Sequence, residues 1–205
     1  MLEIKDTYKT IVKESTGFYK DKGSKFIAET FHVESEEDIK GKMDFVKNKY
    51  HDARHHCYAY CLGFDKSVYR INDDGEPSGT AGKPIFGQIR SKDLTNILIV
   101  VTRYFGGTKL GVRGLINAYK AAAQDSLENT KIITKTVNDF YRVDFPYLLM
   151  NDVMRILKEE NLQQSNQKFE ISCSLEFIVR KRDSIKIYEK FYKINNLEIT
   201  YLRSE

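Results

Sequence analysis

The sequence of 205 residues contains no apolar run that approaches the roughly 18–20 residues a membrane span needs. Its first residues lack the basic segment followed by an apolar segment that marks a secretory signal. Cysteine is scarce, since Cys57, Cys61 and Cys173 are an odd number without the spacing of a disulfide framework. These absences predict reduced thiols, a cytoplasmic location and no membrane partner.

Glycine is missing after Gly114, and proline occurs only three times. Eight of the twelve glycines lie between Gly75 and Gly114, together with Pro77 and Pro84. Only glycine takes φ > 0 without a steric penalty from Cβ, so this density indicates backbone that turns sharply or approaches something closely. The apolar run at residues 96–102 lies between two glycine clusters, and it predicts a buried strand with functional loops at its ends.

Positive charge is concentrated in the same stretch. Residues 136–205 hold equal numbers of acidic and basic residues, so the whole excess of +4 lies in residues 1–135. Between Thr80 and Lys120 the acidic residue is Asp93 alone, while the basic residues are Lys83, Arg90, Lys92, Arg103, Lys109, Arg113 and Lys120. Such a concentration suits a partner that carries phosphates, although counter-ions scattered over a solvated face are an equal alternative.

The second glycine cluster follows the apolar run and precedes a helix predicted at residues 115–123. A strand, a glycine loop and a helix N-terminus can together hold an anion on free backbone N–H groups. The candidate anion-binding or nucleic-acid-binding residues are Lys83, Arg103, Gly106, Gly107, Lys109, Gly111 and Arg113. In the alternative interpretation these glycines only allow a helix to pack closely against a sheet, since their spacing is not that of a dinucleotide fingerprint.

The first glycine cluster, residues 73–84, contains too many glycines and prolines for a helix or a central strand. It also fails to match a phosphate-binding P-loop, because prolines occupy two of the positions that the motif requires. Its acidic residues, which form a candidate partner-binding loop, are Asp73, Asp74 and Glu76. Binding of a divalent cation by the same three residues is the weaker alternative.

Residues 51–62 gather three of the four histidines and two of the three cysteines, a composition that invites a metal hypothesis. Residues 56–62, however, read as a strand, in which Cys57 and Cys61 are about 13 Å apart. Two thiolate ligands of one zinc ion must each lie about 2.3 Å from the metal. We therefore predict that Cys57, Ala59 and Cys61 are small core residues, with no metal, no cofactor and no catalytic residue in the chain.

The remaining pattern describes two domains, residues 1–135 and 136–205, separated by a break near residues 131–138. In the first, strands at residues 8–14 and 24–31 with a turn at residues 15–22 predict an opening hairpin, and Ser35 caps a helix. In the second, strands and helices are expected at residues 139–145, 146–157, 162–167, 169–179, 183–192 and 197–202. Their order, βαββαβ, is that of a ferredoxin-like sandwich.

The motifs DDGEPSGTAGKP at residues 73–84 and VVTRYFGGTKLG at residues 100–111 resemble those of the IMPACT family. The chain is similar to the bacterial YigZ-type members, over residues 1 to about 130, with Arg113 at a position where the family often has glycine. The resemblance implies an α+β fold whose first domain is like the second domain of ribosomal protein S5. It also implies a ferredoxin-like second domain similar to the last domain of translocating elongation factors.

Eukaryotic relatives restrain a starvation-responsive kinase by occupying its activator protein. They carry a different extra domain, so we do not assign this partner to the present chain.

Three functional hypotheses remain. The leading hypothesis is a non-catalytic, translation-associated regulator that binds RNA or the ribosome through the basic glycine-rich loop. The second is a regulator whose residues 73–84 engage a protein partner. The third is an enzyme acting on a phosphorylated small molecule, with Asp73, Asp74 or His55 as the base.

Overall fold

The computed structural model describes residues 6–205, so the first five residues of the predicted first domain lie outside it. The chain divides into two compact units at Lys135 and Thr136. Asp6 and Thr7, which the sequence assigned to the first domain, group instead with the second unit. In the described part, no helix is both long enough and apolar enough to cross a bilayer.

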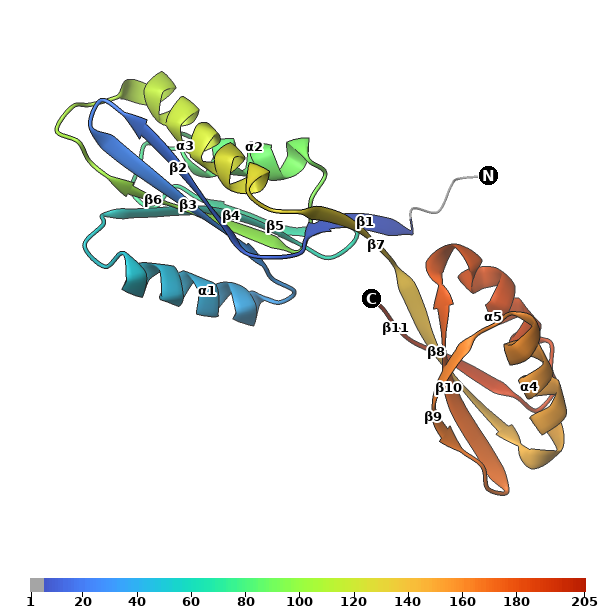
Figure 1. Ribbon diagram of the computed structural model, residues 1–205. Coiled ribbons are helices and arrows are strands. Elements are labelled where there is room, and N and C mark those ends of the chain that lie inside the picture. The colour runs from blue at the N-terminus through green and yellow to red at the C-terminus, as the bar shows by residue number, and fades with distance from the viewer. Residues whose placement is uncertain (1–5) are drawn as a thin grey trace. The chain divides into compact units, whose positions relative to one another are not determined.

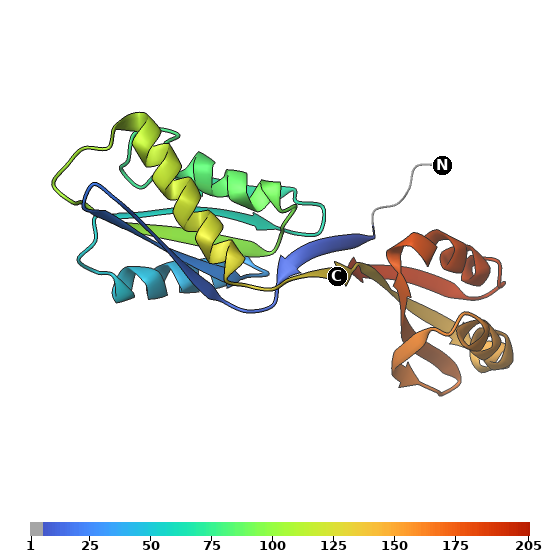
Figure 2. The ribbon, with the colours of Figure 1, turned by 45° about the horizontal axis from the view of Figure 1, so that its top comes forward.

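The first unit is an antiparallel sheet with the strand order β2-β3-β6-β4-β5. Its strands are β2 (Ser15–Asp21), β3 (Ser24–His32), β4 (His55–Leu62), β5 (Val68–Asn72) and β6 (Ile97–Tyr104). Its helices are α1 (Glu36–Lys49), α2 (Gly82–Ser91) and α3 (Gly111–Glu128). Helices α2 and α3 cover one face of the sheet and α1 covers the other (Figure 1, Figure 2). A separate two-stranded ribbon pairs β1 (Thr7–Ile11) with β7 (Ile132–Thr136).

The central strand β6 is buried on both faces, which confirms the predicted buried strand. Ile97 and Ile99 pack beneath α2 and α3, whereas Leu98 and Val100 pack beneath α1. Successive side chains of a strand point to opposite faces, and helices cover both faces here. The strand is therefore apolar without interruption instead of alternating between apolar and polar residues.

The structure of β4 confirms that its two cysteines are core residues, as predicted. Cys57, Ala59 and Cys61 are all buried on the face that packs against α2 and α3. Across residues 6–205, no three metal-ligating side chains lie close enough together to hold an ion. The predicted cap of α1 is also confirmed, since Ser35 Oγ accepts from the backbone N–H of Asp38 in a capping box.

The predicted opening hairpin is wrong in its first strand, because β1 pairs with β7 and the partner of β3 is β2. Residues 15–21 form the strand β2 rather than a turn, and the hairpin turn is Lys22-Gly23, with φ of 43° and 79°. Gly17 lies inside β2, where a Cβ would come within 2.2 Å of the backbone nitrogen of Ser126 on α3. This glycine therefore allows a strand to pack closely against a helix, and the sequence pattern alone suggested a turn.

Two other elements of the first unit were missed. Strand β5 was not expected, and α2 begins at Gly82 within the stretch judged unable to form a helix. Pro84 is tolerated because it lies in the first turn of α2, where the backbone N–H has no partner within the helix. Likewise, the break near residues 131–138 contains the strand β7.

The second unit confirms the predicted βαββαβ order. Its sheet has the order β11-β8-β10-β9, and α4 and α5 cover one face (Figure 1). Its elements are β8 (Asn138–Pro146), a 3-10 turn (Tyr147–Leu149), α4 (Met150–Glu159), β9 (Gln163–Lys168), β10 (Ser172–Arg180), a second 3-10 turn (Lys181–Asp183), α5 (Ser184–Tyr192) and β11 (Glu198–Ser204). Ile171, expected on the buried face, precedes β10 and is 94% exposed. This architecture is a two-unit α+β fold.

Candidate functional site

The two glycine-rich stretches of the sequence meet at a buried ion pair. Arg103, near the end of β6, donates from Nη1 to Oε1 of Glu76 at 2.5 Å. Their side chains are only 8% and 4% exposed. Tyr119 on α3 donates its hydroxyl to the same carboxylate oxygen at 2.9 Å. The acidic and basic ends, expected to be separate surfaces, are therefore joined, and neither Arg103 nor Glu76 faces an external partner in this arrangement.

The ion pair continues into a buried chain of hydrogen bonds. Cys57 Sγ lies 3.3 Å from Tyr119 Oη and 3.0 Å from the carbonyl oxygen of Asp73, so its single proton can be donated to either. Burial raises the pKa of the Cys57 thiol, and it raises the pKa of the Tyr119 hydroxyl as well. Both groups therefore keep their protons at neutral pH, and Cys57 is not an activated nucleophile.

Asp73 closes the N-terminus of α2. Its carboxylate accepts from three backbone N–H groups, those of Gly79 at 2.8 Å, Ala81 at 3.0 Å and Gly82 at 2.8 Å. Burial alone raises the pKa of Asp73, but these three hydrogen bonds outweigh it and hold the pKa below its ordinary value. The acidic loop (residues 73–84) therefore wraps around the carboxylate of Asp73, whose oxygens are occupied by these hydrogen bonds.

Asp74 attaches the acidic loop to β4. Its Oδ2 accepts from the backbone N–H of His56 at 2.6 Å, and its carbonyl oxygen lies 2.7 Å from Nδ1 of His55. A carbonyl oxygen can only accept, so Nδ1 of His55 carries the proton. The stretch that invited a metal hypothesis thus serves to hold the acidic loop in place.

The basic loop (residues 105–110) joins β6 to α3 and is largely exposed. Gly107 has a φ of 87°, and Gly111, the first residue of α3, has a φ of 70°. Helix α3 starts without a side-chain cap and without an acidic residue in its first turn. Its first backbone N–H groups and the positive end of its dipole are therefore available to an anion. Lys109 and Arg113, both exposed, form no ion pair with any residue in the range 6–205.

Gly106 has a different role from Gly107 and Gly111. Its backbone N–H donates to Ser24 Oγ at 3.1 Å, and a Cβ at this position would lie 1.9 Å from the carbonyl carbon of Gly23. The glycine therefore lets the basic loop lie directly against the turn between β2 and β3. Close packing, the alternative weighed for these glycines, thus applies to Gly106, but its neighbour is a turn and not a helix.

We expect Gly106→Ala to lower the free energy of unfolding by about 1–3 kcal/mol, because a methyl group overlaps backbone that cannot move freely. Gly41→Ala is the matched control, since a Cβ at that position on α1 meets no described atom within 4 Å apart from its chain neighbours and the backbone of its own helix. It is expected to raise stability by up to about 1 kcal/mol through helix propensity. Urea unfolding of both variants checks this, and equal effects at the two positions would contradict it.

A cleft of about 410 Å³ lies where the basic loop leaves β6. It is lined by Asp52, Ala53, Arg54, His55, Arg103, Tyr104 and Phe105. Tyr104 donates its hydroxyl to Asp52 at 2.6 Å, a bond that raises the pKa of Tyr104 to about 12. Arg54 is exposed at this cleft, and Phe105 leaves 57% of its surface in solvent. The cleft thus combines a cation with an exposed aromatic ring.

The candidate residues fall into three groups in the structure. Those committed to internal contacts are Asp73, Asp74, Glu76, Arg103 and Gly106. Those exposed on the surface are Lys83, Gly107, Lys109, Gly111 and Arg113. Those that the sequence pattern did not indicate are Arg54, Phe105 and Tyr119. Arg54 and Phe105 lie inside stretches that had been singled out, whereas nothing in the pattern of α3 marks Tyr119.

The chain is similar to known proteins over most of its length. Residues 22–127 match the family described as the Impact N-terminal domain. The IMPACT family member YvyE of Bacillus subtilis is 28% identical over 87% of this chain and 86% of its own length. The IMPACT family member YigZ of Escherichia coli is 35% identical over 66% of this chain and 68% of its own length.

A solved structure titled as that of a hypothetical protein superposes with a TM-score of 0.72. It is 26% identical in sequence and covers 98% of this chain and 99% of its own. The match therefore extends over both units. Since the family match spans half of the sequence and includes both glycine-rich motifs, this chain belongs to the IMPACT family.

Proposed function

We propose that this protein is a non-catalytic, translation-associated regulator that binds single-stranded stretches of RNA, including those of the ribosome. The RNA-binding surface comprises the basic loop, the first turn of α3 and the cleft of Arg54 and Phe105. One observation carries the proposal: Lys109 and Arg113 flank an uncapped helix N-terminus and have no ion-pair partner within residues 6–205. Free cations beside free N–H groups suit phosphate oxygens.

The two parts of this surface have complementary roles. Lys109, Arg113 and the N-terminus of α3 contact phosphates, which positions the strand without reading its sequence. Phe105 offers a face on which an unpaired base can stack, with Arg54 lining the same cleft. Arg103 supports this surface from below, because its guanidinium lies 5.5 Å from the centre of the Phe105 ring while it is paired with Glu76.

The association with translation rests on the family and on the second unit. Residues 139–205 resemble the last domain of translocating elongation factors, and this unit has the corresponding ferredoxin-like strand order. Such a unit in the same chain as an RNA-binding surface is suited to the ribosome.

Internal contacts occupy most of the side chains that the partner-binding and enzyme hypotheses require. A partner-binding role for the acidic loop needs free carboxylates, but Glu76 is buried and Asp73 is occupied by three N–H groups. An enzyme needs a positioned base, and the carboxylates of Asp73 and Asp74 are already engaged by backbone N–H groups. His55 donates from Nδ1 to a backbone carbonyl and keeps Nε2 as its basic nitrogen, so it is the candidate base that the enzyme hypothesis retains.

We expect Lys109→Ala/Arg113→Ala to weaken the binding of a single-stranded RNA and to reduce its salt dependence. Each phosphate contact on a single strand contributes about 0.7 to the slope of log K against log salt, so the double variant loses about 1.4. Fluorescence anisotropy of a labelled oligouridine across a salt series measures the slope. Ribosome co-sedimentation under the same conditions tests the larger partner.

Lys40→Ala/Lys47→Ala is the matched control, since it removes two exposed cations from α1 on the opposite face of the sheet. It should leave the slope unchanged, whereas Phe105→Ala should lower the affinity at every salt concentration without changing the slope. RNA affinity that is independent of salt, or equal slopes for the two double variants, would refute the proposal.

A further inference from the structure

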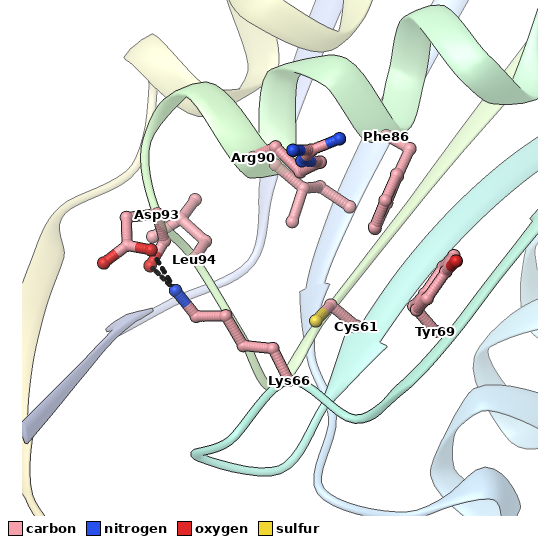
Figure 3. A pocket seen from close by; sticks show the side chains of 8 residues that line it. Cys61, Lys66, Tyr69, Phe86, Arg90, Asp93 and Leu94 are labelled. Atoms are coloured by element: carbon pink, nitrogen blue, oxygen red, sulfur yellow. Dashed lines mark hydrogen bonds and ion pairs between the residues drawn. The ribbon is translucent and has the colours of Figure 1, made fainter. Parts of the chain in front are cut away.

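A second hollow, of about 390 Å³, lies away from the motif loops, between α2 and the hairpin of β4 and β5 (Figure 3). Its floor is apolar and consists of Cys61, Ile89 and Leu94, all buried. The volume lies within the range of small-molecule sites, which are mostly apolar with few polar groups. Neither the RNA-binding surface nor the ion pair beneath it uses these residues.

One wall of this hollow is a pair of aromatic rings from different elements. Tyr69 on β5 and Phe86 on α2 stack with their centres 4.9 Å apart and their planes 13° from parallel (Figure 3). Tyr69 is nevertheless 59% exposed. The pair therefore presents a flat, partly open apolar face, which favours a ligand with a flat apolar body.

The opposite side is closed by a bridge between two loops. Lys66, after β4, donates from Nζ to the carboxylate of Asp93 and to its carbonyl oxygen at 2.9 Å (Figure 3). This pairing neutralises the ammonium of Lys66 and holds the hairpin against the end of α2. The bridge therefore shapes the hollow and adds no net charge to it.

Arg90 supplies the remaining charge. It is exposed, lines the hollow from α2 and forms no ion pair within residues 6–205. Arg90 follows Phe86 by four residues, so the two side chains are neighbours on one face of the helix, about one turn or 5.4 Å apart. The lining residues thus carry one uncompensated positive charge next to an aromatic wall.

We propose that this hollow is a binding site for a small, flat organic anion: an aromatic or unsaturated ring with one acidic group about one helical turn from the ring centre. The ring lies against Phe86 and Tyr69, and the acidic group pairs with the guanidinium of Arg90. The thiol of Cys61 at the floor stays protonated because burial raises its pKa, so it does not repel the anion.

Two naphthylamine probes that differ by one sulfonate group test this proposal. The anion is 1-anilinonaphthalene-8-sulfonate, and the neutral compound is N-phenyl-1-naphthylamine. We expect the full chain to bind the anion at a single saturable site about tenfold more tightly than the neutral probe, the difference that one charge-assisted contact provides. Fluorescence titration of the folded protein gives both dissociation constants.

Three variants locate the site. Arg90→Gln should abolish the preference for the anion and leave the affinity for the neutral probe unchanged, whereas Phe86→Leu should weaken both. Lys83→Gln is the control, because Lys83 is an exposed cation on the same helix that does not line the hollow. Equal affinity for the two probes in the wild type, or a preference that survives Arg90→Gln, would overturn the proposal. So would loss of the preference in Lys83→Gln.

Discussion

Arg103→Ala is expected to lower the free energy of unfolding of the first unit by about 3–5 kcal/mol, the cost of leaving a buried charge without its partner. The carboxylate of Glu76, 4% exposed, loses the guanidinium and, within residues 6–205, keeps the hydroxyl of Tyr119 as its hydrogen-bond donor. The guanidinium also lies 5.5 Å from the centre of the Phe26 ring, so a cation–π contact disappears as well. Hydrogen exchange at the β6 amides reports on this unit separately from the second.

A double replacement separates the charge effect from general disruption. Arg103→Met/Glu76→Leu removes both charges and keeps much of the apolar volume, so it should be more stable than either Arg103→Ala or Glu76→Ala alone. Lys109→Ala is the control for a basic residue outside the network and should change stability by less than about 0.5 kcal/mol. The structural role of Arg103 is refuted if Arg103→Ala unfolds like the wild type while RNA affinity falls.

Asp73→Ala is expected to have the second largest effect, about 3 kcal/mol, because three backbone N–H groups lose an ionised acceptor at once. The N-terminus of α2 is then left without a cap, and the loop that carries Glu76 loses its anchor. Asp44→Ala, an exposed carboxylate on α1, is the control and should be nearly neutral. Urea unfolding and hydrogen exchange of the α2 amides measure both variants.

The pH dependence of this effect has a definite sign. The pKa of Asp73 in the folded protein is below its ordinary value, so the carboxylate binds protons more weakly in the folded state than in the unfolded state. Its contribution is complete above the unfolded pKa of about 3.9 and is lost as pH falls through the folded pKa. The stability difference between wild type and Asp73→Asn should therefore be constant near neutral pH and shrink below about pH 4. A difference that grows on acidification would contradict this account.

Patterns that depend on neighbours a few residues apart were readable in the sequence. The cap at Ser35 joins residues three apart, and the alternation of residues 173–179 follows from the period of a strand. The order βαββαβ follows from such local signals alone, and so does the buried strand β6. Each depends on the backbone geometry of one element, which a short segment largely determines for itself.

Glycine was the least reliable signal, because a missing side chain permits several structures. Gly17 is in a strand against a helix, Gly106 is against a turn, and Gly107 adopts a positive φ. The sequence shows only that no Cβ is present. Which atom occupies the space, or whether the backbone angle is the reason, is decided by segments that come together from elsewhere in the chain.

The structure separates the candidate site residues that composition had grouped together. Charge and glycine density pointed to residues 73–114, and Lys109 and Arg113 have the exposure that a phosphate-binding residue needs. Arg103, chosen for the same reason, is instead buried against Glu76. All three are basic residues within three positions of a glycine, so composition does not distinguish them. Only the position of β6 between its neighbours buries Arg103 and not the other two.

The sequence by itself thus determined the α+β class, the order of elements in the second unit and the concentration of positive charge in the first. The tertiary structure alone decided which charges remain available. Asp73 reaches the start of α2 across a loop, Glu76 meets Arg103 from another element, and Tyr119 joins them from α3. These contacts join residues 9, 27 and 43 positions apart, at distances along the chain where no local periodicity links the partners. Burial then makes the pairing obligatory, because an ionised group removed from water must find an opposite charge or a hydrogen-bond donor.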